Sequence, residues 1–218
     1  MLGAAGGLLA LLGLAQLLLP ALAARRIRSD LAPYGVVRSA SVSAFPAIEL
    51  LWGKAQSASV STGPLNVDPA EVGSLLWRAR GVQRVDLHAE SMRVGALALS
   101  DVSWQKRGER LYTTGVIGEA QLRKALPGSS SFRLLSSGPG GVEVQVGGSL
   151  FGLSASIDVQ LTATDGQLVA APRGPFGGLV RVRLLSASHL YVQSVALADA
   201  PAVGADPAYR VSIAAQLR

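Results

Sequence analysis

Alternation between polar and apolar positions is the dominant pattern along this chain, and it predicts β-structure over most of its length. The first clear case is Val36–Thr62, in which two serine-rich strands each keep small apolar residues on one face. The apolar face holds Ala40, Val42, Ala44, Ala58 and Val60, and the polar face holds Ser39, Ser41, Ser43, Ser57, Ser59 and Ser61. Two half-buried strands are therefore expected here.

The two strands are joined by an apolar connection, Phe45–Gly53, called the elbow below. Pro46 has no N–H to give to a strand ladder and restricts the residue before it, so the first strand must end or bend there. Gly53 lets the chain turn again. Two interpretations of the elbow remain open. Its large apolar side chains either plug one end of the core or line the mouth of an apolar cavity.

Asp68–Arg80 is the clearest helix in the sequence. Asp68 is a favourable N-cap, Pro69 suits the first helical position, and Gly81 is the expected C-terminal cap. One apolar stripe with helical spacing contains Val72, Leu75, Leu76 and Ala79. Trp77 lies off this stripe, with Arg78 and Arg80 beside it in the last turn.

The remaining sequence predicts a second short helix and further strands. Val82–Ser91 alternates cleanly, Gly118–Leu126 has helical spacing, and nearly everything after Phe132 is typical of β-strands, including a hairpin turn at Asp165-Gly166. About nine or ten strands and two or three helices are expected. The predicted fold class is α+β and mostly β, with a curled antiparallel sheet or open barrel wrapped against two or three helices.

Residues 1–24 form a continuous apolar run without charge. The Leu-rich segment and the Ala21-Leu22-Ala23 pattern are typical of a cleaved signal peptide. The length also suits an uncleaved signal anchor or transmembrane anchor, and a buried helix of the domain is a third interpretation. Arg25, Arg26 and Arg28 follow the run, where the positive-inside tendency favours the reverse orientation. Residues 25–218 are expected to form a single domain.

The composition argues against several functional classes. The chain contains no cysteine, which excludes disulfides and thiol catalysis, and its net charge of +6 is scattered along the sequence. His88 and His189 are too far apart in sequence to suggest a metal site, and Gly147–Phe151 departs from a nucleophile elbow at its last position. We expect no enzyme activity, no cofactor, no metal and no nucleic-acid partner, although a hydrolase with an unrecognised site stays a minor alternative.

The order of motifs is similar to that of one known family. An apolar leader and a short helix precede Ala44-Phe45-Pro46, then Leu51-Trp52-Gly53-Lys54, a serine-rich strand, the strand–helix unit Thr113–Leu126, and β-hairpins to the end. This arrangement resembles the LmeA-like phospholipid-binding proteins of actinobacterial cell envelopes, from Arg25 onward. The resemblance implies a curled sheet similar to tubular lipid-binding domains. It also implies phospholipid binding without an enzymatic reaction.

These observations lead to a hypothesis of non-catalytic phospholipid binding, with lipid transfer or maintenance as further roles, in an exported or anchored envelope protein. The partners would be phospholipids, anionic ones above all, and a membrane surface, with the oligomeric state undetermined. The competing hypothesis is a structural or protein-interaction envelope domain with a fully packed core. The expected lipid-binding residues are Phe45, Pro46, Leu50, Leu51, Trp52, Leu75, Leu76, Trp77, Leu122 and Leu126, with Arg78 and Arg80 at the headgroups. Alternatively, Trp77 covers a sheet edge and the arginines complement the helix C-terminus.

Overall fold

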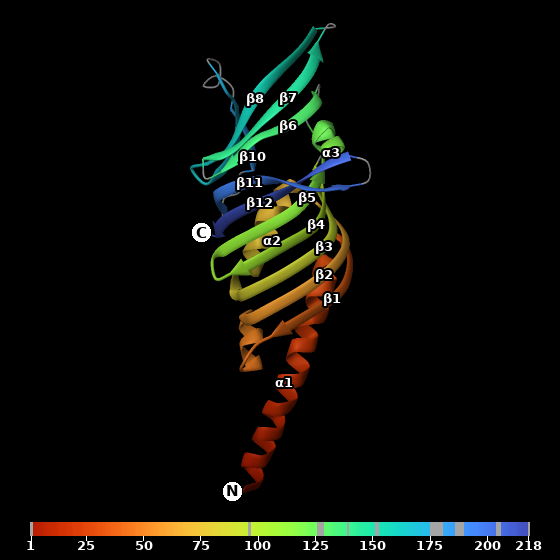
Figure 1. The fold of residues 1–218 in the computed structure, drawn as a ribbon. Coiled ribbons are helices and arrows are strands. Elements are labelled where there is room, and N and C mark those ends of the chain that lie inside the picture. The colour runs from red at the N-terminus through yellow and green to blue at the C-terminus, as the bar shows by residue number, and fades with distance from the viewer. Residues whose placement is uncertain are drawn as a thin grey trace.

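The computed structural model agrees with the predicted fold class: it is mostly β-structure, with a few helices packed against the sheets (Figure 1). It describes residues 2–95, 97–125, 129–138, 140–150, 153–174, 181–185, 190–203 and 206–217. The helices are α1 (Leu2–Leu31), α2 (Pro69–Arg78) and α3 (Glu119–Ala125), with the 3₁₀ turns η1 (Ala47–Trp52) and η2 (Ala79–Gly81). The strands are β1 (Gly35–Ser43), β2 (Ala55–Val67), β3 (Val82–Val94), β4 (Leu97–Arg107), β5 (Arg110–Gly118), β6 (Ser129–Gly138), β7 (Gly141–Leu150), β8 (Leu153–Thr164), β9 (Gln167–Pro172), β10 (Val182–Leu185), β11 (Leu190–Val203) and β12 (Asp206–Leu217).

The strands form two sheets, and in the described residues neither closes into a barrel. The larger sheet has the order β1-β2-β3-β4-β5-β12-β11, and the smaller one has the order β10-β9-β8-β7-β6. One pair departs from the antiparallel prediction, because β2 and β3 run parallel. The reason lies in the connection: α2 carries the chain back along the sheet, so that β3 begins at the same end as β2.

The alternation in β1 to β3 sorts side chains between two faces, as the sequence predicts. Ala40, Ala58 and Val60 are buried on the inner face, and so are Val85 and Ala89 of β3. The serines pair across the outer face, where Ser43 Oγ lies 2.7 Å from Ser57 Oγ. The outer face is therefore polar, while the inner one is available for packing.

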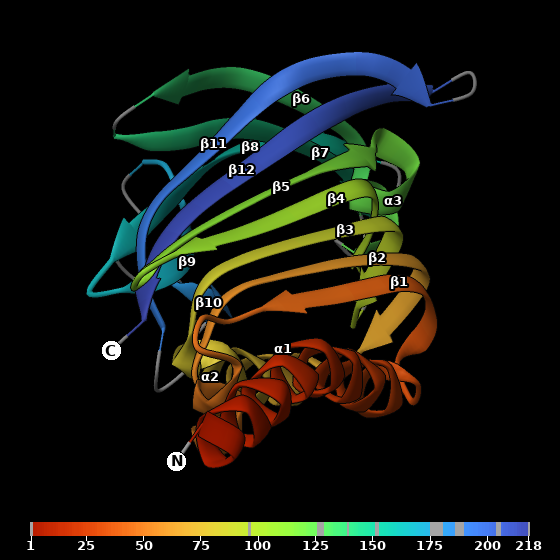
Figure 2. The same cartoon turned by 90° about the horizontal axis from the view of Figure 1, so that it is seen from below.

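The large sheet curves, and both α1 and α2 lie on its concave side (Figure 2). Ile27 and Leu31 of α1 pack against a cluster that contains Ala24, Ala40 and Val60. Val72 and Leu75 of α2 pack against Leu65, Val67, Ala89 and Val102. Small side chains on the sheet allow α1 to approach closely. Because the sheet is curved, one of its faces covers both helices.

The smaller sheet packs against the far end of the large one. The largest core cluster joins Phe132, Val142, Val144 and Leu168 of the small sheet to Ile117, Val195, Leu197 and Tyr209 of the large sheet. Phe132 and Tyr209 meet edge to face, with ring centres 5.2 Å apart. The turn Asp165-Gly166 has positive φ at both residues, which confirms the predicted hairpin.

The molecule is open rather than spherical. The chain exposes 13340 Å² of surface, whereas a compact monomer of its mass exposes about 9,400 Å². The projecting N-terminal half of α1 and the splayed small sheet both contribute to this excess (Figure 1).

A single helix, α1, contains the apolar run and continues through residues 25–31. Its C-terminal half belongs to the packed domain, because Ala24, Ile27 and Leu31 contact the sheet. Within the described part of the chain, no helix has the combined length and apolar character needed to cross a membrane.

A buried lysine fixes the end of α2 to the sheet. The Lys106 side chain on β4 is 2% exposed, and its Nζ donates to the Val82 carbonyl and to the Arg80 carbonyl, the latter at 3.4 Å. A helix end leaves carbonyls without intrahelical donors, and this ammonium group satisfies such a carbonyl. Burial lowers the pKa of Lys106, and the charge of Glu109 opposes this effect.

We expect Lys106→Met to lower the free energy of unfolding by about 1–3 kcal/mol, because buried carbonyls lose their donor. In the folded parent, the pKa of Lys106 lies below the ordinary 10.5. At pH values between these two, the unfolded parent therefore binds more protons than the folded parent. The parent should therefore gain stability relative to the variant as the pH rises through that window. Urea unfolding at several pH values measures both effects. Lys124→Met, which alters an exposed lysine, is the control, and equal midpoints for the two variants would contradict this role.

Candidate functional site

The elbow is a compact turn that ends β1 and begins β2. The Lys54 N–H donates to the Glu49 carbonyl at 3.1 Å, and Gly53 adopts a left-handed conformation with φ of 69°. Gln56 closes the connection, since its side-chain amide donates to the Phe45 carbonyl at 3.2 Å. These bonds hold the elbow in a defined shape at one end of the large sheet.

The elbow buries its small residues and exposes its aromatic ones. Ala44 and Ala47 are buried, and Leu50 is half-buried. Phe45 is 73% exposed and Trp52 is 69% exposed, and Pro46 between the strand and η1 is exposed too. The structure does not describe the side chain of Leu51. Phe45 and Trp52 therefore do not plug the core, as the first interpretation of the elbow would require.

The end of α2 presents a second aromatic residue together with cations. Trp77 is 38% exposed and lies off the apolar stripe, as its spacing predicts. The Arg80 guanidinium lies over its ring, 3.9 Å from the centroid. Arg78 is also exposed. This segment therefore turns Leu75 to the sheet, and it turns Trp77, Arg78 and Arg80 toward the surface.

The elbow and the end of α2 are neighbours in space. A Cβ placed on Gly81 would lie 2.3 Å from the Gly53 carbonyl oxygen, so the two backbones are in direct contact. Both segments contain residues that the sequence predicted to bind lipid, and the fold brings these segments together. We call the combined surface the aromatic–basic edge. Its members are Phe45, Trp52, Lys54, Trp77, Arg78 and Arg80, all of which are exposed.

The other predicted lipid-binding residues lie elsewhere. Leu75 packs between α2 and the sheet, and Leu122 packs against the core between the two sheets. The side chain of Leu76 is not described, and Leu126 lies outside the described residues. The fold therefore separates the exposed aromatic residues of the prediction from its packed leucines.

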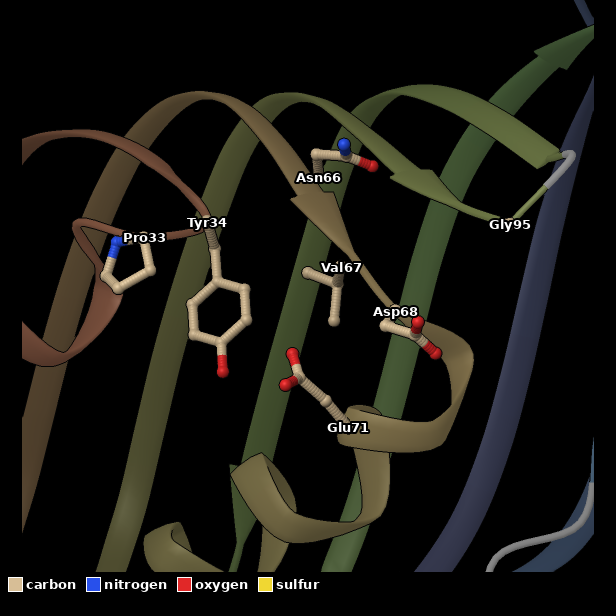
Figure 3. Close-up of a pocket in the computed structure, with 7 residues that line it drawn as sticks. All are labelled: Pro33, Tyr34, Asn66, Val67, Asp68, Glu71 and Gly95. Carbon is tan, nitrogen blue, oxygen red and sulfur yellow. The ribbon is translucent and has the colours of Figure 1, made fainter.

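A pocket of about 440 Å³ lies at the opposite end of α2 (Figure 3). The Tyr34 hydroxyl and the Glu71 carboxylate point toward one another, and Asn66 and Asp68 complete a mainly polar lining. Desolvation, the hydrogen bond to Glu71 and the charge of Glu71 raise the pKa of Tyr34, while Arg78 lowers it. The Asn66 N–H donates to the Tyr34 carbonyl at 2.8 Å. These contacts tie α2 to the start of β1.

No metal-binding group is assembled in the described residues. They contain no group of three or more histidine, aspartate or glutamate side chains that could hold a metal ion. His88 is exposed on the outer face of β3, and His189 lies outside the described residues. A second pocket, of about 300 Å³, is lined by Glu143 and Arg173, which form an ion pair at 2.5 Å.

Sequence reasoning missed two residues that shape this region. Lys106 is separated from Trp104 and Val102 by steps of two residues along β4. The alternation of a strand therefore places its side chain on the same inner face as theirs. Gln16 is the strongly polar residue of the apolar run, and its Oε1 accepts a hydrogen bond from the Ala47 N–H at 3.2 Å. Lys106 and Gln16 are both polar residues at positions where the surrounding pattern is apolar. A polar residue at such a position is the signal that could have identified them.

Searches of protein-family models, curated proteins and solved structures found no match to this chain.

We expect Gly81→Ala to disturb the aromatic–basic edge, because the added methyl group would collide with the Gly53 carbonyl. Overpacking of this kind costs about 1–3 kcal/mol in stability. Thermal unfolding of the variant measures the cost. Gly118→Ala adds the same methyl group where no atom lies within 4 Å, and it should melt close to the parent. Equal losses in both variants would argue against the backbone contact.

Proposed function

We propose that this protein binds phospholipid without hydrolysing it. The observation that carries the proposal is the aromatic–basic edge, in which two segments far apart in sequence expose aromatic rings beside cations at one end of the molecule. Exposed apolar patches that are rimmed by polar residues mark contacts with proteins or membranes. Indole and phenyl rings are favourable at the boundary between headgroups and acyl chains.

The charges at this edge favour anionic lipid. Lys54, Arg78 and Arg80 are all exposed, and each basic residue near an anionic membrane contributes about 1 kcal/mol. Glu49 is the acidic residue of the elbow, and it is half-buried. The side chains beside the exposed aromatic rings therefore carry a net positive charge.

We infer binding at the surface of the domain and not in an enclosed apolar chamber. Both pockets described above are lined mainly by polar residues, and the concave face of the large sheet is occupied by α1 and α2. The resemblance to LmeA-like envelope proteins adds support from sequence motifs, and with it a role in lipid transfer or maintenance.

A second candidate function is that of a structural or protein-interaction domain of the envelope. The packing of both helices on the concave face favours it, because a filled interior needs no lipid. The two candidates differ in what the aromatic–basic edge contacts, namely a lipid surface or another protein.

For the location of the protein, we propose the extracytoplasmic cell envelope. The apolar run at residues 1–24 and the Ala21-Leu22-Ala23 pattern support export.

We expect the purified chain to bind vesicles containing phosphatidylglycerol more tightly than neutral vesicles, and to release no fatty acid from them. Arg78→Ala combined with Arg80→Ala should weaken binding to anionic vesicles by about 30-fold, since two cations are lost. Adding Trp77→Ala should weaken it further. Co-sedimentation measures binding, and mass spectrometry of the lipids detects hydrolysis.

Arg181→Ala combined with Arg183→Ala is the matched control, because it removes the same charge from exposed positions on and beside β10. Equal weakening by both pairs would mean that net charge alone drives binding. If native mass spectrometry of the purified chain detects no bound lipid and the chain does not bind vesicles, these results would favour the protein-interaction candidate. Release of fatty acid by the pure protein would contradict the non-catalytic part.

A reporter enzyme that is active only outside the cytoplasm should be active when it is fused to the C-terminus. The physical reason is the apolar N-terminal run, which suits recognition by the export machinery. A reporter that works only in the cytoplasm is the control fusion. Activity of that control would support the reverse orientation, which the arginines after the run favour.

A further inference from the structure

We propose that the outer face of the large sheet carries a binding site for a phosphate group, formed by Arg84, Arg107 and Arg110. These three residues are called the arginine row below. The inference goes beyond the proposed function, because none of the three belongs to the aromatic–basic edge. A phosphate ester in solution and a lipid headgroup both present the group that this site would bind.

The first support is the strand register, which brings three guanidinium groups together. Arg84 of β3 lies directly opposite Arg107 of β4, and Arg107 lies directly opposite Arg110 of β5. Side chains that are directly opposite on neighbouring strands share one face of the sheet, with Cβ atoms about 5 Å apart. Neighbouring strands are about 4.8 Å apart, so the row is about 10 Å long. All three residues are exposed.

The second support is that folding leaves much of this charge without a partner. Like charges that lie directly opposite each other destabilise a sheet. Arg107 forms an ion pair with Asp86 at 2.6 Å. The guanidinium groups of Arg84 and Arg110 have neither an ion pair nor a hydrogen bond within the described part of the chain. An arrangement that breaks a local rule of sheet stability is expected mainly at functional sites.

The surrounding side chains do not cancel the positive charge of the row. Residues 82–86 and 105–110 contain four basic side chains and two acidic ones, since Lys106 and Glu109 join the row and Asp86. The Glu109 carboxylate accepts a hydrogen bond from the Gln216 side-chain amide at 3.2 Å, and among the described residues it forms no ion pair with the row. The local field therefore attracts an anion.

The third support is that the central guanidinium of the row is held in place and still has donors to offer. Arg107 Nη1 donates to the Val85 carbonyl at 3.2 Å and to the Lys106 carbonyl at 2.9 Å. Arg107 Nη2 donates to Asp86 Oδ1. A guanidinium has five N–H donors, so two donors of Arg107 remain available to a ligand.

The hairpin that joins β4 to β5 is held in place as well. The Gly108 N–H donates to the Gln83 carbonyl of β3 at 2.8 Å. The Leu217 N–H of β12 donates to the Glu109 carbonyl at 2.8 Å. The turn is thus bonded to the strand on either side, which fixes the backbone from which the row projects.

The number and arrangement of the donors favour phosphate over a carboxylate. Guanidinium groups match the oxygens of both anions, but a carboxylate offers only two oxygens. A phosphate group offers at least three, so several guanidinium groups can bind it at once. Both α1 and α2 lie on the concave side of the sheet (Figure 2), so neither helix covers the row.

The test measures binding of two probes to the full-length chain at low ionic strength, by isothermal titration calorimetry. The soluble probe is glycerol 3-phosphate, and the lipid probe is a vesicle that contains phosphatidylglycerol. Arg84→Gln with Arg110→Gln should weaken binding of at least one probe by about tenfold or more. Arg84→Lys with Arg110→Lys keeps the charge but loses the planar fork, so it should restore binding only in part.

The matched control is Arg93→Gln with Arg210→Gln, which removes the same charge from exposed positions on β3 and β12. Arg93 lies nine residues beyond Arg84 on β3, about 30 Å away at 3.3 Å per residue. The control should bind both probes like the parent. Equal weakening by the control and by the Arg84→Gln, Arg110→Gln variant would overturn the inference, because net charge alone would then explain the binding.

A second measurement is thermal unfolding with and without the probe that the parent binds. Without it, the Arg84→Gln, Arg110→Gln variant should melt no lower than the parent, since the substitutions remove repulsion between neighbouring strands. The probe should raise the melting temperature of the parent and leave that of the variant nearly unchanged. An equal rise in both proteins would place the bound phosphate elsewhere and overturn the inference.

The two probes identify the source of the phosphate and keep this inference separate from the proposed function. A loss confined to glycerol 3-phosphate supports a soluble ester as the ligand, and a loss confined to vesicles supports a lipid headgroup. If the Arg84→Gln, Arg110→Gln variant binds both probes like the parent, the inference is overturned. The proposed function still stands in that case if vesicle binding depends on Arg78 and Arg80.

Discussion

The packing of two helices against the concave face of one curved sheet is the interaction on which the rest of the structure depends. The inner face near β1 and β2 is built largely from alanine and valine, so α1 lies close to the sheet. Larger side chains there would push the helix away, because interiors are packed at nearly crystalline density. The same packing fixes the level of the elbow relative to α1, and so decides which aromatic residues are exposed together.

The parallel pairing of β2 and β3 is a consequence of how α2 is used. The helix fills the concave face and also returns the chain to the end of the sheet where the elbow lies. Lys106 and the contact between Gly53 and Gly81 then hold the helix end in place. A buried ammonium group is costly without hydrogen-bond acceptors, and the helix end provides the carbonyl of Arg80. Arg80 therefore has two roles. Its carbonyl accepts a hydrogen bond from buried Lys106, and its guanidinium lies over the Trp77 ring at the surface.

The two ends of α2 have different characters. At its start, Tyr34, Asp68 and Glu71 form a polar pocket whose groups largely satisfy each other. At its end, aromatic rings and cations face solvent. A lipid surface would favour the second end and repel the carboxylates of the first. The fold therefore separates the acidic end of α2 from its aromatic and basic end.

The sequence by itself determined which faces of the strands are buried, where α2 begins and ends, and the hairpin at Asp165-Gly166, because these features depend on local periodicity and on the conformational limits of proline and glycine. It also identified the elbow and the end of α2 as unusual surfaces. Their adjacency was decided by tertiary structure alone, since Gly53 and Gly81 meet only through the crossover of α2. The role of α1 was equally beyond the sequence. In a run in which nearly every residue is apolar, only packing can decide that Ala24 is buried and that Leu18 and Leu22 are exposed.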